Sequence, residues 1–266
     1  MVTMKLETKP VGKYGMVLDK DVEVPMRDGG KMVVNVYRPD APGKFPALTA
    51  CGPYGKDLHL KENFPATYAY IEKNQPQILA NSTGKYLQHE MPDIECFVRE
   101  GYVIVRGDVR GTSKTPGLQD PNSPLEYRDG YDVVEWAAAQ PWCTGKVGMI
   151  GDSYWSWTQY AAAIAQPPHL ACICQQDSTP DFYRDVCFQG GLWHYEFLGR
   201  WIPYHTAQYL WPGTVEGKLP PMSLLEETFS RPYDGEWYRE RSPWPRLDRI
   251  KVPVLSIAPQ GGAMHF

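Results

Sequence analysis

The sequence has no run of basic residues, no long hydrophobic stretch and little net charge, and each absence excludes a class of protein. Its 266 residues contain 27 Lys and Arg against 31 Asp and Glu, so nothing in it would follow a phosphate backbone. No stretch approaches the length of a membrane span, and residues 1–18 lack the hydrophobic core of a signal peptide. We therefore expect no nucleic acid partner, no membrane partner and a cytoplasmic location.

Cysteine is sparse, and its spacing does not fit a metal site. Cys172 and Cys174 would lie on one face of a strand, but no further Cys or His follows them at a ligand spacing. We expect reduced, buried thiols and no metal. The six cysteines are Cys51, Cys96, Cys143, Cys172, Cys174 and Cys187.

Strand and helix patterns alternate along much of the chain, whose 42% hydrophobic residues suffice for one large domain or a domain with an insertion. Residues 20–28 and 31–38 indicate a hairpin around Asp28-Gly29-Gly30. A third strand at 45–51 precedes a long polar excursion, with one short helix near 68–73. Helices are then predicted at 93–100 and 125–140, and strands at 102–106, 147–150 and 170–174.

This order predicts an α/β fold with a mostly parallel sheet and helices on both faces. Ligands bind at the carboxyl ends of the strands in such sheets. Tyr54, the loop after Arg106 and Ser153 all fall at those ends.

The stretch 147–165 organises the rest of the chain. Its first four residues indicate a buried strand and its composition becomes helical from Trp157, so residues 151–154 must turn between the two. Ser153 stands at the apex. A serine lifted above a sheet edge, with free N–H groups and the positive end of a helix nearby, is the geometry of a nucleophile elbow.

Two features of this turn bear on its interpretation. Trp155 occupies the position of the last glycine in the pattern G-x-S-x-G, and Ser156 is the small residue that would let the helix pack closely behind the serine. An ordinary strand-to-helix turn is the alternative interpretation of the same residues.

Residues 179–243 interrupt the alternation and are rich in Pro, Gly and aromatic residues. We predict a helical cap insertion whose aromatic rings form core, pocket lining or both. The predicted parts are 20–178, the first part of a core; 179–243, the cap; and 244–266, a return to the core through a strand at 252–257. Seven aromatic residues lie within 19 positions: Trp193, Tyr195, Phe197, Trp201, Tyr204, Tyr209 and Trp211.

Four motifs together resemble the cocaine-esterase and Xaa-Pro dipeptidyl-peptidase group (CocE/NonD, S15-like) of α/β-hydrolases. The resemblance runs from about residue 20 to the end and covers the N-terminal portion of that group. The α/β-hydrolase fold is what the resemblance implies. The motifs are Cys51-Gly-Pro-Tyr-Gly-Lys56, Arg106-Gly-Asp-Val-Arg-Gly-Thr-Ser-Lys-Thr-Pro-Gly117, Asp132-Val-Val-Glu-Trp-Ala-Ala-Ala-Gln-Pro-Trp142 and Gly145-Lys-Val-Gly-Met-Ile-Gly-Asp-Ser-Tyr154.

The resemblance also implies roles for individual residues. Ser153 would be the nucleophile, and the oxyanion hole would consist of the Tyr54 hydroxyl and the Tyr154 backbone N–H. A donor preset for the developing negative charge contributes on the order of 3 kcal/mol. Asp108 and Arg110 match the group's loop and are interpreted as structural, an internal ion pair or a brace for the turn.

The chain lacks a recognisable acid and base. In α/β-hydrolases the acid and then the histidine follow the serine in chain order. After the strand at 252–257 only residues 258–266 remain, and they contain no carboxylate. His265 is the one histidine there and is retained as a candidate base, although it lies where the acid loop belongs. Asp152 is interpreted as pointing away from the serine rather than as the orienting acid. The C-terminal part of the fold is expected to be missing.

Two hypotheses therefore stay open. In one, the chain is the N-terminal part of a serine hydrolase that cleaves an ester or amide through an acyl-enzyme. In the other, it is a catalytically inactive hydrolase-like module kept for binding. Acidic residues of the predicted cap are scattered (Asp181, Asp185 and Glu196), so no pocket for a free amine is indicated. The expected substrate is a small-molecule ester, amide or short peptide, with an ester or amide preferred, and this chemistry requires no metal or organic cofactor.

Overall fold

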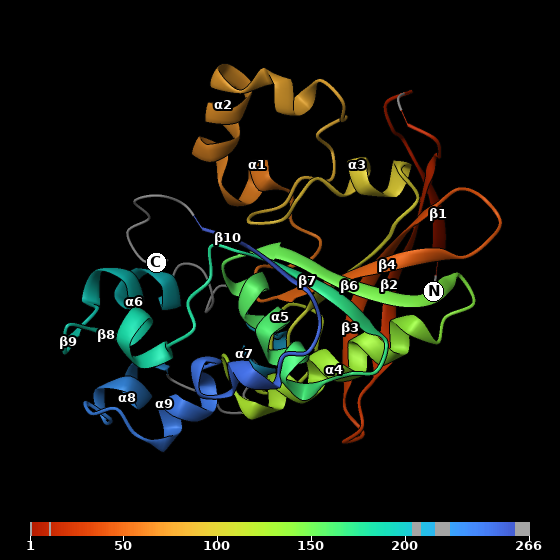
Figure 1. The fold of residues 1–266 in the computed structure, drawn as a ribbon. Helices are drawn as coiled ribbons and strands as arrows, with labels where there is room; N and C mark the ends of the chain where they lie inside the picture. Colours follow the sequence, from red (N-terminus) through yellow and green to blue (C-terminus); the bar gives the residue numbers. More distant parts are fainter. Residues whose placement is uncertain (1, 11, 204–208, 216–223, 259–266) are drawn as a thin grey trace.

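The computed structural model describes residues 2–10, 12–203, 209–215 and 224–258. Within them one eight-stranded sheet has the order β1-β2-β3-β5-β4-β6-β7-β10 (Figure 1). The strands are β1 (Val2–Leu6), β2 (Met16–Pro25), β3 (Lys31–Pro39), β4 (Phe45–Gly52), β5 (Val103–Asp108), β6 (Cys143–Asp152), β7 (Leu170–Gln176) and β10 (Val254–Ile257).

The sheet is mixed, and its parallel part carries the predicted site. β1, β2, β3 and β5 pair antiparallel in that order, whereas β5, β4, β6, β7 and β10 pair parallel. The predicted hairpin is confirmed between β2 and β3, where Gly29 takes the left-handed φ of 85° that its turn requires. The predicted α/β fold is also confirmed, with an antiparallel edge added to the expected parallel sheet.

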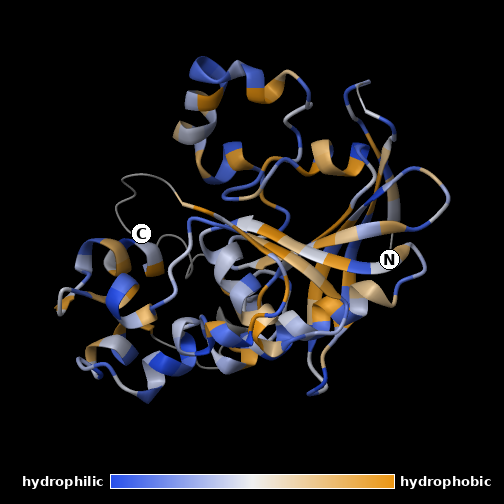
Figure 2. Ribbon diagram, viewed as in Figure 1, coloured by the Kyte–Doolittle hydropathy of each residue, from blue (hydrophilic) through white to orange (hydrophobic). Residues whose placement is uncertain are grey.

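Helices cover both faces of this sheet, with α1 to α3 on one side and α4 and α5 on the other (Figure 1). Both faces of β5 are apolar and need to be covered. Val103 and Val105 belong to the larger of two hydrophobic core clusters, whereas Ile104 between them belongs to the smaller one, with Ile94 of α3. Alternation of this kind follows from the two-residue period of a strand. Figure 2 shows hydrophobic residues along the central strands. These helices are α1 (Leu60–Asn63), α2 (Pro65–Asn74), α3 (Ile94–Arg99), α4 (Pro124–Ala138) and α5 (Tyr154–Ala165), with the 3₁₀ helix η1 (Pro76–Leu79).

The segment 179–243 contributes helices and a large share of the aromatic core. Leu198, Trp201 and Tyr238 are buried in the same cluster as the sheet, whereas Tyr195 is 75% exposed. The division into three parts stays a prediction. The described elements from Phe182 to Arg249 are the π-helix η2 (Phe182–Cys187), β8 (Phe188–Gln189), β9 (Leu192–Trp193), α6 (Tyr195–Trp201), α7 (Pro212–Val215), α8 (Leu224–Phe229), α9 (Glu236–Arg241) and η5 (Trp244–Arg249).

Several local expectations need correction. The helix after the serine begins at Tyr154 rather than Trp157, and the strand before it runs to Asp152. The N-terminal residues form β1, an edge strand that the polar sequence did not predict. All six cysteines are free as expected, but only three of them are buried: Cys96 and Cys174 are partly buried and Cys172 is exposed. Among the described residues, no helix is long and apolar enough to cross a membrane.

Candidate active site

Ser153 is the single residue between β6 and α5, and its backbone is strained. Its φ of 56° and ψ of −118° place a non-glycine residue in a region that L-amino acids rarely adopt. Glu90 and Asp177 also have positive φ, and both adjoin the same turn: Glu90 O accepts from Asp152 N at 3.0 Å, and Asp177 directly follows β7. Three strained residues at the carboxyl edge of a sheet point to a functional site.

The turn is compatible with Trp155 because glycines make room for the indole. A Cβ added to Gly151 would lie 2.4 Å from the Trp155 Cβ, and one added to Gly52 would lie 2.8 Å from the indole ring. Trp155 is completely buried as a result. The glycines that permit a close approach therefore stand at the end of β4 and before the serine, rather than after it.

Ser156 fastens the start of α5 to the sheet. Its hydroxyl contacts the Gly151 carbonyl at 2.9 Å and the Gln176 carbonyl at 2.8 Å, and it accepts from the Gln176 N–H at 2.7 Å. Ser153 N also donates to Gln176 O at 3.0 Å. The serine at the turn is thus held by backbone contacts with β7, which leaves its hydroxyl available for other partners.

Tyr54 lies just beyond the end of β4 with its hydroxyl at the Ser153 turn. The hydroxyl accepts a hydrogen bond from Trp201 Nε1 at 3.2 Å. Burial raises the pKa of Tyr54 well above its ordinary value. The charge of Glu90 and a hydrogen bond with it also favour the protonated form, whereas hydrogen bonds from Trp201 and Ser153 act in the opposite direction. The net effect keeps the hydroxyl protonated, as a hydrogen-bond donor must be.

Tyr154 is the first residue of α5, so its N–H has no acceptor within the helix. Its side chain is anchored: the hydroxyl donates to Glu126 Oε1 at 2.6 Å. Glu126 belongs to a capping box at the start of α4, since its other oxygen accepts from Asn122 N at 2.7 Å and its own N–H donates to Ser123 Oγ at 3.4 Å. One helix cap thereby fixes the residue beside Ser153.

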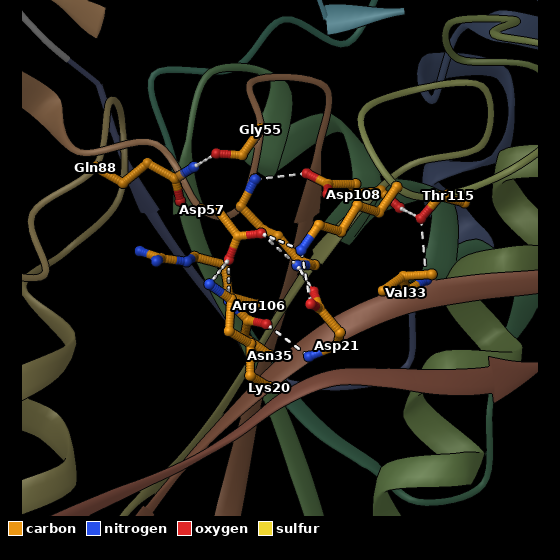
Figure 3. A network of polar contacts seen from close by, with 12 residues as sticks. Lys20, Asp21, Val33, Asn35, Gly55, Asp57, Gln88, Arg106, Asp108 and Thr115 are labelled. Atoms are coloured by element: carbon orange, nitrogen blue, oxygen red, sulfur yellow. Dashed lines mark hydrogen bonds and ion pairs between the residues drawn. The ribbon is translucent and has the colours of Figure 1, made fainter. Parts of the chain in front are cut away.

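A polar network holds the loop that carries Tyr54 (Figure 3). The Lys56 ammonium is fully buried and lies 2.6 Å from Asp21 Oδ1 and 2.9 Å from Asp57 Oδ2. The Lys56 N–H donates to Asp108 Oδ1 at 2.6 Å, and Gln88 Nε2 donates to the Gly55 carbonyl at 2.6 Å. The two residues that follow Tyr54 are therefore anchored through both backbone and side chain.

This network corrects one expectation and supports another. Arg110 does not pair with Asp108; its ion pairs are with Asp129 at 2.6 Å and Asp28 at 2.9 Å. Asp108 acts as the turn brace through Lys56. Burial raises the pKa of Asp108 to about 7.

Carboxylates gather at the serine turn rather than in the segment 179–243. Burial, together with the charges of Glu90 and Asp177, raises the pKa of Asp152 to about 7. Asp152 and Glu90 line a pocket of about 380 Å³ that also includes His89 and Gln176. The fold thus brings together Glu90, Asp152 and Asp177, which are far apart in the sequence.

The histidines divide into those that the structure places and those outside the described residues. His265, the candidate base, and His205 belong to the second group. His89 lies nearest the site: its ring centroid is 5.3 Å from that of Tyr54 and 3.8 Å from that of Phe64, and Nε2 is 3.1 Å from Glu90 Oε1. Chain order alone argues against a role for His89 at the site. Within the described ranges, no group of three His, Cys, Asp or Glu could hold a metal ion.

The buried carboxyl of Glu126 makes stability depend on pH. Burial raises its pKa from an ordinary 4.5 to about 8. Between these values the folded state binds more protons than the unfolded chain, so the free energy of unfolding falls as pH rises, by up to about 1.4 kcal/mol per unit. Urea unfolding at several pH values between 5 and 8 should show a flatter dependence for Glu126→Gln. Glu240→Gln, at an exposed position of α9, should keep the original dependence, and an equally steep curve for Glu126→Gln would contradict the assignment.

A sheet of this order defines an α/β-hydrolase when a serine with positive φ stands between a strand and the following helix, as Ser153 does here. The chain belongs to the X-Pro dipeptidyl-peptidase (S15) family, which matches residues 28–261. This is a family of serine hydrolases, and the resemblance stated from the motifs is confirmed.

Individual relatives agree with this assignment. The chain is 34% identical over 191 residues to the cocaine esterase of Rhodococcus sp. (strain MB1 Bresler), covering 71% of this chain and 28% of that protein. A CocE/NonD family hydrolase from Staphylococcus aureus is 31% identical with a TM-score of 0.75, over 90% of this chain and 40% of the other. An aminopeptidase from the marine sediment archaeon Thaumarchaeota archaeon, 19% identical with a TM-score of 0.68, shares the fold over 93% of this chain and 43% of its own. The chain thus spans less than half the length of these relatives.

Proposed function

We propose that this chain carries the nucleophile and oxyanion hole of a serine hydrolase that cleaves an ester or amide through an acyl-enzyme. The observation that carries the proposal is the convergence on one turn of Ser153, the buried Tyr54 hydroxyl and the first N–H of α5. Family membership supports it.

In the proposed reaction the Ser153 oxygen attacks the substrate carbonyl and its proton passes to a general base. The carbonyl oxygen becomes negative and accepts hydrogen bonds from the Tyr54 hydroxyl and the Tyr154 N–H. Collapse of this intermediate expels the alcohol or amine and leaves an acyl ester on Ser153, which water then hydrolyses. His265 stays a candidate for the base.

We propose a small carboxylic ester or amide as the substrate. The relative named a cocaine esterase supports an ester over a peptide.

Labelling with a fluorophosphonate tests the proposal, because attachment requires an activated serine. We expect mass spectrometry to locate the label on Ser153, and Ser153→Ala to abolish it. Ser156→Ala is the matched control: its hydroxyl is bonded to the backbone of Gly151 and Gln176, so labelling should persist. A folded chain that takes up no label would support the alternative, a module that binds without catalysing.

A further inference from the structure

The contact between Trp201 and Tyr54 joins two parts of the chain that are 147 residues apart. An indole N–H can only donate, whereas a tyrosine hydroxyl has one proton and two acceptor positions. Because Trp201 Nε1 occupies one acceptor position of the Tyr54 oxygen, the Tyr54 proton must point away from Trp201. Ser153 and Glu90 also form hydrogen bonds with this hydroxyl.

We propose that Trp201 is a positioning residue that directs the Tyr54 proton toward the oxygen bound at Ser153. The inference rests on the proposed function and adds a third residue to its oxyanion hole. In the structure the hydroxyl also forms a hydrogen bond with Glu90, and an oxygen bound at Ser153 would take the place of that acceptor. Without the indole N–H, the Tyr54 hydroxyl is free to rotate, and its proton is no longer held in one direction. A donated hydrogen bond also polarises the hydroxyl and strengthens it as a donor.

Trp201 is well placed for this role because its ring is fixed on several sides. It ends α6, is 5% exposed, and stacks on Phe197 with 5.4 Å between centroids and 17° between planes. Trp157 meets it edge to face at 6.0 Å, and Tyr154 lies 6.0 Å away. The position of α6 therefore determines whether the Tyr54 hydroxyl is correctly oriented.

Trp157 provides a matched control. It is also buried and its ring lies 5.4 Å from Tyr154, but its Nε1 donates to Thr179 Oγ1 at 3.2 Å rather than to Tyr54. Changing either tryptophan to phenylalanine keeps an aromatic ring and removes one N–H. Only Trp201→Phe removes the N–H that reaches Tyr54.

The experiment uses residues 1–266 with 3-fluorotyrosine at position 54, compared with the same protein carrying Trp201→Phe or Trp157→Phe. We expect Trp201→Phe to shift the fluorine resonance. We also expect it to lower the maximal rate of fluorophosphonate labelling by about five- to tenfold, the worth of one hydrogen bond. The probe concentration for half-maximal rate should stay unchanged. Trp157→Phe should alter neither the resonance nor the rate.

Two outcomes would overturn the inference: an unchanged fluorine resonance in Trp201→Phe, or equal losses of labelling rate in both variants, which would indicate a general packing effect. Failure of the unsubstituted chain to label is a different result. It would count against the proposed function, and the fluorine resonance would then decide by itself whether Trp201 holds the hydroxyl.

Discussion

Replacing Tyr54 by phenylalanine is expected to lower kcat for ester hydrolysis by about 100- to 1,000-fold with little change in KM, if the proposed function holds. The hydroxyl would bind the carbonyl oxygen chiefly when that oxygen is negative, so its loss affects the transition state more than the bound substrate. The side chain is 2% exposed, and the phenylalanine ring fills nearly the same space. A chromogenic ester assay over a range of substrate concentrations separates kcat from KM.

Tyr238→Phe is the appropriate control for this experiment. Tyr238 is 1% exposed and its hydroxyl donates to the Arg231 carbonyl at 2.8 Å, so the change removes a buried tyrosine hydroxyl away from Ser153. It should cost stability and leave kcat within a few-fold of the original. Equal losses of kcat in the two variants would assign the Tyr54 effect to packing, and an unchanged kcat in Tyr54→Phe would remove Tyr54 from the oxyanion hole.

The positions of Tyr54 and Ser153 could be predicted because they depend on strand order. Each follows a strand of the parallel part of the sheet, and the carboxyl ends of such strands meet at one edge. β5 was predictable for a similar reason, since Val103, Ile104 and Val105 are all buried and form a continuous apolar run.

The start of α5 could not be located because its first residues are poor helix formers. Tyr154 and Trp155 have lower helix propensity than the alanines that follow, so composition placed the boundary too late. Tertiary contacts decide the true boundary: Trp155 fits against Gly52 and Gly151, and Ser156 bonds to two strands. The capping box from Ser123 to Glu126 was present in the sequence and would have located α4 more closely.

The contacts around Tyr54 illustrate what sequence patterns omit. No spacing rule links Trp201 or Glu90 to a residue that is far away in the chain, and the positive φ of Glu90 has no signal in its residue type. Burial of Lys56 also runs against expectation, because lysine is almost never fully buried unless it is paired. In this chain the pairing comes from Asp57, the next residue, and from Asp21, which is distant in the sequence.

Replacing Lys56 by methionine is expected to lower the free energy of unfolding by roughly 2 to 4 kcal/mol. Removing one partner of a buried ion pair leaves the other charges uncompensated, at a cost of about 3 to 5 kcal/mol. The expected loss lies toward the lower end because Asp21 and Asp57 are 38% and 30% exposed and keep Lys114 nearby. Urea unfolding followed by tryptophan fluorescence measures the loss.

Comparison with Lys114→Met distinguishes the effect of burying the Lys56 side chain from the effect of its charge. Lys114 contacts the same two carboxylates, Asp21 at 2.6 Å and Asp57 at 3.2 Å, but its side chain is 48% exposed whereas that of Lys56 is fully buried. Exposed ion pairs contribute less than about 1 kcal/mol, so Lys114→Met should have a small effect. Because the Lys56 ammonium anchors the loop after Tyr54 to Asp21 and Asp57, Lys56→Met should also slow labelling of Ser153, which Lys114→Met should not. Equal losses of stability in the two variants would mean that the charge of Lys56, and not its burial, accounts for its contribution to stability.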